Sequence, residues 1–135
     1  MTAPSPKAAF AGTWEITWTE VWLKDALDLI QTAFIRFENT LDSDQGEFAM
    51  IAMRGGLDCW YGQRDGRPAV EFSWQGDDDG EERCGRGWAV LENGAKLRGR
   101  LFIHCGDDSE FVAERAPRVE ATSRRSGKRR RPSVR

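Results

Sequence analysis

The sequence has few residues of the types that build catalytic and metal sites. Among its 135 residues there is one histidine, His104, and there are three widely spaced cysteines, Cys59, Cys84 and Cys105. A site built from several histidines is therefore excluded, and a Ser-His-Asp or Cys-His arrangement could use only His104. The cysteines form no Cys-x-x-Cys pair, so they indicate neither a zinc knuckle nor a disulfide framework. We expect three reduced thiols.

Long apolar runs are also lacking. No stretch approaches the roughly 18–20 residues that span a bilayer, and the segment Met1 to Lys7 lacks the apolar core of a secretory signal. We therefore expect a cytoplasmic protein with no membrane partner. Hydrophobic residues make up 39% of the chain, which is enough for the core of one domain.

Charge is present in quantity, and its distribution is uneven. The net charge of −2 combines +7 over residues 116–135 with −9 over the rest of the chain. We predict a flexible N-terminus (1–9), a β-barrel domain (10–115) and a disordered basic tail (116–135). The tail residues predicted to contact a polyanion are Arg124, Arg125, Lys128, Arg129, Arg130 and Arg131.

Apolar and polar residues alternate with period two in short runs between turn signals. Asp65-Gly66 and Asn93-Gly94 predict tight hairpins, and Gly55-Gly56 is interpreted as a break between two runs. The runs are 13–19, 33–38, 48–53, 57–61, 70–74, 88–90, 97–103 and 111–115. They predict an all-β fold, an eight-stranded antiparallel up-and-down barrel, because closure removes the exposed edges of a long meander. A seven- or eight-stranded sandwich is the alternative.

One short segment has helical rather than strand periodicity. Between the first two runs, Leu23, Leu27 and Ile30 follow an i, i+4, i+7 spacing, which predicts a short helix with one apolar face. We interpret this segment as a plug for one barrel end. A mobile lid, or an apolar patch for a partner, is the alternative.

The start of the first run resembles a known family signature. Phe10-Ala11-Gly12-Thr13-Trp14 is similar to the Gly-x-Trp start of calycin barrels, which include the lipocalins, the fatty-acid-binding proteins and, more distantly, the avidins. The resemblance implies that a basic residue at the end of the last strand packs across this tryptophan to close the barrel. Arg115 matches that role opposite Trp14. Residues 85–89 and 104–109 also resemble segments of short bacterial proteins of unassigned function.

Parity along the runs predicts an aromatic barrel interior. The side chains expected to point inward are Trp14, Trp18, Phe37, Phe48, Tyr61, Phe72, Trp74, Trp88 and Phe111. Six of them are candidate contacts for a small apolar ligand: Trp18, Phe37, Tyr61, Phe72, Trp74 and Trp88. The alternative is that these rings simply fill the core. Trp60 has the opposite parity, so we expect it on the surface, where it would mark an interface.

The remaining polar motifs do not converge on a reaction centre. The acidic stretches 77–82 and 42–47 lack the full ligand spacing of a calcium loop, so we expect solvated hairpin tips. His104 lies near Asp107 and Asp108, but no further catalytic group accompanies them. We therefore predict a non-catalytic binding protein without cofactor or metal. Its partner would be a small apolar ligand inside, or a protein or second copy outside. The alternative is a nucleic-acid or other polyanion-binding protein acting through the tail.

Overall fold

The computed structural model describes residues 5–38, 40 and 42–116. The predicted polyanion contacts from Arg124 to Arg131 lie outside the described residues.

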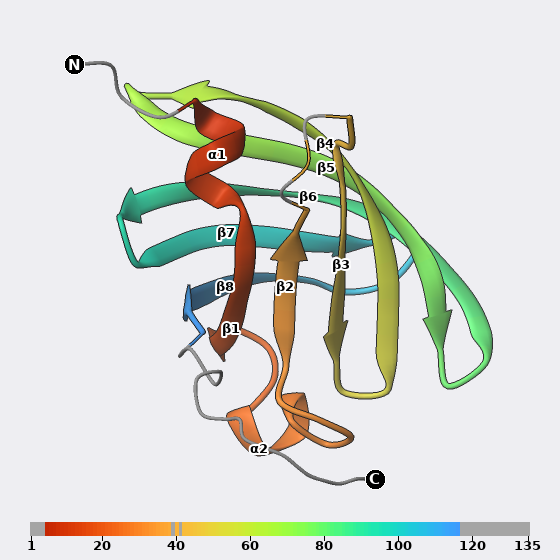
Figure 1. The fold of residues 1–135 in the computed structure, drawn as a ribbon. Helices are drawn as coiled ribbons and strands as arrows, with labels where there is room; N and C mark the ends of the chain where they lie inside the picture. The colour runs from red at the N-terminus through yellow and green to blue at the C-terminus, as the bar shows by residue number, and fades with distance from the viewer. Residues whose placement is uncertain (1–4, 39, 41, 117–135) are drawn as a thin grey trace, which may run out of the picture.

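Eight antiparallel strands form a closed barrel in which each strand pairs with its sequence neighbours and the last pairs with the first (Figure 1). The strands are β1 (Gly12–Thr19), β2 (Phe34–Phe37), β3 (Gln45–Met50), β4 (Met53–Arg64), β5 (Arg67–Asp78), β6 (Glu81–Asn93), β7 (Lys96–Ile103) and β8 (Asp108–Arg115). The predicted up-and-down barrel is confirmed, and the sandwich alternative is wrong. Simple hairpin connections produce this order because each strand returns beside the one before it.

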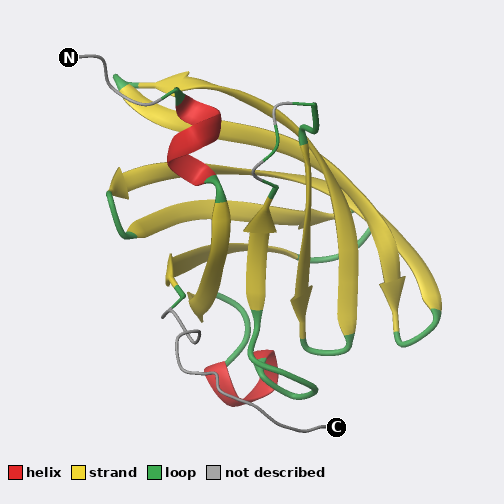
Figure 2. Cartoon of the chain, viewed as in Figure 1, coloured by secondary structure: helices red, strands yellow, loops and turns green. Residues whose placement is uncertain are grey.

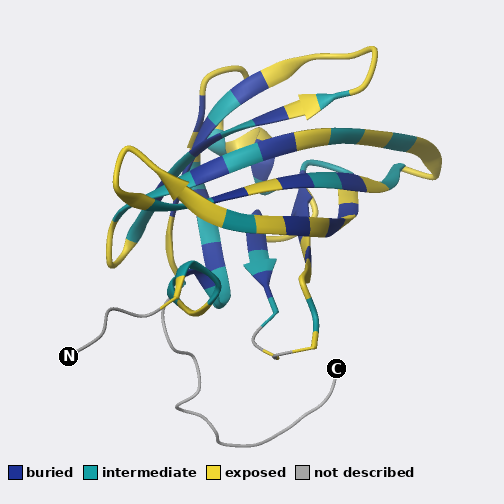
Figure 3. Cartoon of the chain, turned by 90° about the horizontal axis from the view of Figure 1, so that it is seen from above, coloured by how far each residue is buried: buried dark blue, intermediate teal, exposed yellow. Residues whose placement is uncertain are grey.

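Burial follows the pleat of the strands. Along β4, buried Leu57 and Cys59 alternate with exposed Asp58 and Trp60, and similar bands recur on the other strands (Figure 3). Successive side chains of a strand point to opposite faces, so one face of the curled sheet becomes the interior and the other faces solvent. The apolar interior is continuous from Phe10 to Ala113.

Two short helices close the opposite ends of the barrel (Figure 2). The first, α1 (Pro6–Phe10), begins with Ser5 as its N-cap, whose Oγ accepts a hydrogen bond from the Ala8 N–H. Phe10 is fully buried and packs edge-on against Phe37 at 5.4 Å. Residues 6–9 of the predicted N-terminal segment 1–9 belong to this helix.

The second helix, α2 (Lys24–Leu27), lies between β1 and β2 as predicted. Leu27 is fully buried, and its carbonyl accepts a hydrogen bond from the Ile51 N–H in the β3–β4 turn. The predicted apolar face is wrong for its other two members, because Leu23 is 81% exposed and Ile30 is 69% exposed. The helix has a single turn, which is too short to align residues seven apart.

The third and fourth strands meet at a different turn from the one predicted. The chain reverses at Ile51 and Ala52, where Ile51 has a φ of 59°, and Gly55-Gly56 lies inside β4. Gly55 faces the interior, where an added Cβ would lie 2.7 Å from the Trp74 ring. Gly55 therefore allows the Trp74 ring to pack closely against the strand, and it does not form a turn.

Candidate functional site

The barrel interior is filled by side chains. The rings of Phe48 and Trp74 meet edge to face at 5.0 Å. The apolar void near Ile16, Ile35 and Phe111 has a volume of about 10 Å³. Small-molecule sites enclose roughly 300–1,000 Å³, so this void is far too small for a ligand of ordinary size.

Four of the six predicted ligand contacts belong to this packed core. Phe37, Phe72 and Trp74 are buried, and Tyr61 packs partly buried against Phe10. Nearby, burial raises the pKa of the Cys59 thiol to about 12. These rings therefore fill the barrel instead of lining an empty pocket.

The inward prediction is wrong for Trp18. The pairing of β1 with β8 shifts register between Ile16 and Trp18, and this irregularity reverses the parity of the strand end. Thr19 is consequently buried, while Trp18 is 46% exposed.

The inward prediction is also wrong for Trp88. Small residues occupy the inward positions of β6, where Gly87 lies under the Phe72 ring and Ala89 is fully buried. An added Cβ on Gly87 would lie 2.4 Å from that ring. The large core rings of β5 therefore require small partners on β6, and Trp88 points outward beside Arg100 and Glu71.

The structure brings the proposed closure pair together. The guanidinium carbon of Arg115 lies 4.0 Å from the centre of the Trp14 ring. Arg115 also donates hydrogen bonds to the carbonyls of Ala11 (2.6 Å) and Ala9 (3.0 Å) at the end of α1. The Trp14 indole N–H donates to the carbonyl of Phe10 at 2.9 Å. Partial burial lowers the pKa of the Arg115 guanidinium.

Concave space lies instead on the outer face of β4–β7. Three hollows of about 210, 470 and 710 Å³ follow one another across these strands. The first two share Glu71 and Trp88, and the second and third share Arg86 and His104. Gly56 contributes to the concavity, since an added Cβ there would meet nothing within 4 Å. We call this surface the outer trough and define it by Asp58, Trp60, Arg64, Glu71, Arg86, Trp88, Phe102 and His104.

Aromatic rings and arginines alternate in the outer trough. Trp60 is 53% exposed and Phe102 is 39% exposed. The guanidinium of Arg64 lies 4.5 Å over the Trp88 ring, and that of Arg86 lies 6.0 Å from the Trp60 ring. Trp60, Glu71 and Trp88 are direct cross-strand partners and form one row over β4, β5 and β6.

Basic side chains are concentrated on this face. By the strand alternation, the outward basic residues of β4–β7 are Arg54, Arg64, Arg67, Arg86, Lys96, Arg98 and Arg100. The outward acidic residues are Asp58, Glu71, Asp77, Glu82 and Glu92. This face thus has seven cations and five anions, whereas residues 1–115 as a whole carry a net charge of −9.

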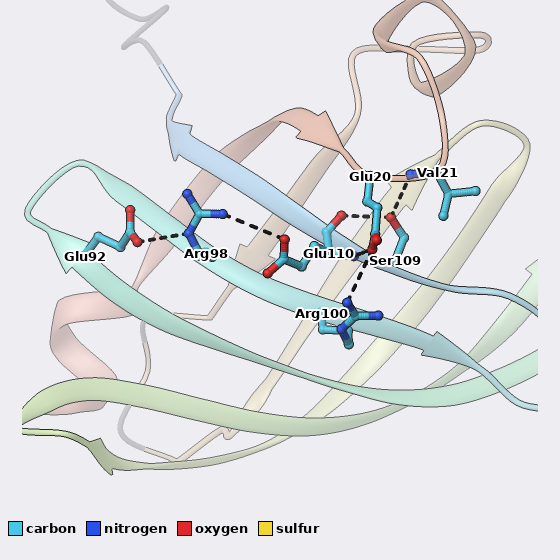
Figure 4. A network of polar contacts seen from close by, with 7 residues as sticks. All are labelled: Glu20, Val21, Glu92, Arg98, Arg100, Ser109 and Glu110. Atoms are coloured by element: carbon cyan, nitrogen blue, oxygen red, sulfur yellow. Dashed lines mark hydrogen bonds and ion pairs between the residues drawn. The ribbon is translucent and has the colours of Figure 1, made fainter.

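The cations of this face differ in their partners. Arg98 is bound by Glu92 at 3.0 Å and Glu110 at 4.0 Å, and Arg100 is bound by Glu20 at 3.3 Å (Figure 4). Among residues 5–38, 40 and 42–116, no carboxylate lies within ion-pair distance of Arg64 or Arg86. Arg54, Arg67 and Lys96 also form no ion pair within these described residues, but only Arg64 and Arg86 combine an open cation with a position over a tryptophan ring.

The structure does not assemble the sequence motifs that suggested acid–base or metal chemistry. Asp108 forms an ion pair with Arg100, and His104 is exposed opposite Cys84. In the acidic stretch 77–82, Asp77 accepts a hydrogen bond from the Gly80 N–H within a tight turn. Over the described part of the chain, no three His, Cys, Asp or Glu side chains are arranged to hold a metal ion.

Sequence reasoning placed Trp60 outside but missed its neighbours in the trough. Once the strands are paired, Arg64, Glu71 and Arg86 point to the same outer face as Trp60. The strand register is therefore the information that would have predicted them. No family model, curated protein or solved structure matches the chain in the comparisons made. Among the described residues, no helix has both the length and the apolar character needed to cross a membrane.

Proposed function

We propose that this chain is a non-catalytic, calycin-like binding protein that takes up its partner on the outer trough and not inside the barrel. The observation that carries the proposal is the contrast between a void of about 10 Å³ inside and connected hollows of about 210–710 Å³ outside. The Trp14–Arg115 contact supports the calycin-like part.

Three outward-facing rings form the binding surface of the outer trough, of which Trp60 and Phe102 are exposed and Trp88 is partly buried. Trp60, Trp88 and Phe102 come from three different strands of a rigid sheet, so their positions are fixed before a partner arrives. Tryptophan and arginine are enriched among residues that dominate binding energy, because a large ring or planar cation buries much surface and loses few rotamers. The alternation of Trp60, Arg86, Trp88 and Arg64 fits that description.

Mapping of amide shifts by NMR tests where a partner binds. The full chain is titrated separately with a single-stranded oligonucleotide, an uncharged oligosaccharide, an acidic peptide and a fatty acid. We expect at least one probe to shift amides of the outward residues of β4–β7, while the fatty acid leaves the amides of Phe72 and Trp74 unchanged. Saturable fatty-acid shifts at Phe72 and Trp74 would contradict the proposal, as would a panel in which no probe shifts the trough.

A cavity-forming variant serves as the control for interior binding. Phe72→Ala removes a fully buried ring, and apolar cavities of that kind take up small apolar molecules such as benzene. We expect benzene to shift interior amides in Phe72→Ala and not in the natural sequence. Equal interior shifts in both proteins would show that the barrel opens readily, against the proposal.

A further inference from the structure

We propose that the outer trough binds single-stranded nucleic acid, with bases stacking on Trp60 and Trp88 and phosphates pairing with Arg64 and Arg86. This inference rests on the proposed function, because it names the partner of the same surface. Proteins that bind single strands combine aromatic platforms, on which bases stack, with cations along the backbone path. Both components occur together on the outer face of β4–β7.

The rings are placed for stacking on separate bases. Trp60 and Trp88 stand on β4 and β6, with Glu71 of β5 between them. Neighbouring strands lie about 4.8 Å apart, so the two tryptophans are separated by about 10 Å across the sheet. Phe102, on β7, pairs with Arg86 and extends the surface by one more strand. An extended chain of flat groups therefore meets successive rings.

The arginines over these rings are suited to phosphate. Arg64 and Arg86 already lie with their guanidinium groups over Trp88 and Trp60, and within the described ranges neither has a carboxylate partner. Planar guanidinium groups pair with phosphate oxygens through two parallel hydrogen bonds and also stack on bases. Arg98 and Arg100 differ, because Glu92, Glu110 and Glu20 hold them (Figure 4).

The charge distribution favours a polyanion over a neutral partner at this face. Acidic residues dominate the barrel as a whole, yet the outward face of β4–β7 carries more cations than anions. At physiological salt the Debye length is about 8 Å, so local charges outweigh distant ones. The segment 116–135 carries a charge of +7, so it also favours a polyanion as the partner of the full chain.

The two carboxylates of the trough also have a role with a nucleic acid. Glu71 lies between the tryptophans, and Asp58 is on the neighbouring row with Ser73 and Arg86. Carboxylates accept hydrogen bonds from the exocyclic amino groups of bases. In a duplex the base faces are stacked on each other and are not free to stack on Trp60 and Trp88. The trough therefore selects single strands.

Fluorescence anisotropy of the full chain with a labelled twelve-nucleotide RNA or DNA tests the inference. We expect Trp60→Ala and Trp88→Ala each to weaken binding by roughly 10-fold or more, since stacking on an aromatic side chain is lost. Trp18→Ala is the matched control, because Trp18 is similarly exposed but lies on β1. Trp60→Phe keeps a stacking ring and should retain most of the affinity. A cooperative thermal unfolding transition well above the assay temperature confirms that each variant is folded.

Salt dependence separates the trough from the tail. Arg64→Gln and Arg86→Gln should each reduce the slope of log K against log salt by about 0.7, the value for one phosphate on a single strand. Trp60→Ala should leave that slope unchanged. Arg36→Gln, which removes an arginine already paired with Glu47, is the control. A full-length variant with Arg129, Arg130 and Arg131 changed to Gln reports the contribution of the tail.

Several outcomes would overturn the inference. One is binding that the trough variants leave intact and the tail variant abolishes. Another is a duplex bound as tightly as the single strand, and a third is no binding of either nucleic acid at low salt. If an oligosaccharide or peptide shifts the trough amides instead, the nucleic-acid inference fails while the proposed function stands. If no probe shifts the trough, both fail.

Discussion

The guanidinium of Arg115 lies 4.0 Å from the centre of the Trp14 ring, across the ladder where the last strand meets the first. The same guanidinium donates hydrogen bonds to two carbonyls at the C-terminal end of α1. One side chain thus joins β8, β1 and the helix that covers this end of the barrel. A cation is favourable at this position, because carbonyl groups at a helix end and the face of an indole ring both carry partial negative charge.

Removing the Arg115 side chain should therefore destabilise the barrel. We expect Arg115→Ala to lower the free energy of unfolding by roughly 1–3 kcal/mol, from the lost cation–π contact and charged hydrogen bonds. Arg36→Ala, which breaks an exposed ion pair with Glu47, should cost about 0–1 kcal/mol. Urea denaturation measures both. Equal losses in the two variants would contradict the closure role of Arg115.

Adjacent glycines of β4 should respond in opposite ways to the same substitution. Gly55→Ala should destabilise the protein by roughly 1–3 kcal/mol, because its Cβ would lie 2.7 Å from Trp74 and 2.8 Å from Phe48. Gly56→Ala should be neutral or stabilising, because nothing lies within 4 Å of its Cβ and alanine restricts the unfolded chain. Thermal unfolding of the pair checks the inward and outward assignment directly. Similar melting temperatures would contradict it.

Two aromatic substitutions test the parity of β5 and β6. Phe72→Ala should cost about 3–5 kcal/mol, since a fully buried ring leaves a cavity. Trp88→Ala should cost about 1 kcal/mol or less, mainly through its cation–π contact with Arg64. The measurement is the midpoint and slope of denaturant unfolding. A loss at Trp88 as large as that at Phe72 would place Trp88 in the core.

The contacts of Asp28 predict loss of stability in acid. Partial burial alone would raise the pKa of Asp28, but hydrogen bonds from the Ala33 N–H and Lys24 outweigh it and hold the pKa below 3.8. A carboxylate with a lowered folded-state pKa stabilises the protein above its unfolded pKa, and this contribution disappears as the pH falls through the folded pKa.

We therefore expect the difference in unfolding free energy between the natural sequence and Asp28→Asn to be constant from about pH 5 to 8 and to shrink below about pH 4. Denaturant unfolding across pH 2.5–8 provides the measurement. Asp25→Asn, an exposed carboxylate of the same helix, is the charge-matched control. A difference that grows toward low pH would have the wrong sign for a lowered pKa.

The strand count and the barrel were predictable because turn chemistry is local. Asp65 and Gly66 have φ angles of 53° and 78° in the observed hairpin, which is the conformation that this dipeptide favours. The inward or outward direction of each side chain was harder to predict, because one register irregularity reverses it for every later residue of the strand. Trp18 became exposed in that way, and no feature of its neighbours in sequence announces the register shift.

The outer trough could not be predicted from the sequence of any one β-strand. Trp88 and Val90 look like an inward pair until Phe72 is placed opposite Gly87, which requires the β5–β6 register. Arg64 meets Trp88 although they are 24 positions apart in sequence, because β4, β5 and β6 run side by side. Long-range pairing, and not residue type, brings the candidate binding groups together.

The closed ladder order has a consequence for how the chain folds. Every pairing except one joins consecutive strands, so each hairpin can form soon after its second strand is available. The β1–β8 ladder is different, because the partners Trp14 and Arg115 stand 101 positions apart in the sequence. Closing so large a loop costs entropy before its contacts repay it. We therefore expect the β1–β8 ladder to form last. A nascent chain would have two unpaired sheet edges until Arg115 has emerged from the ribosome.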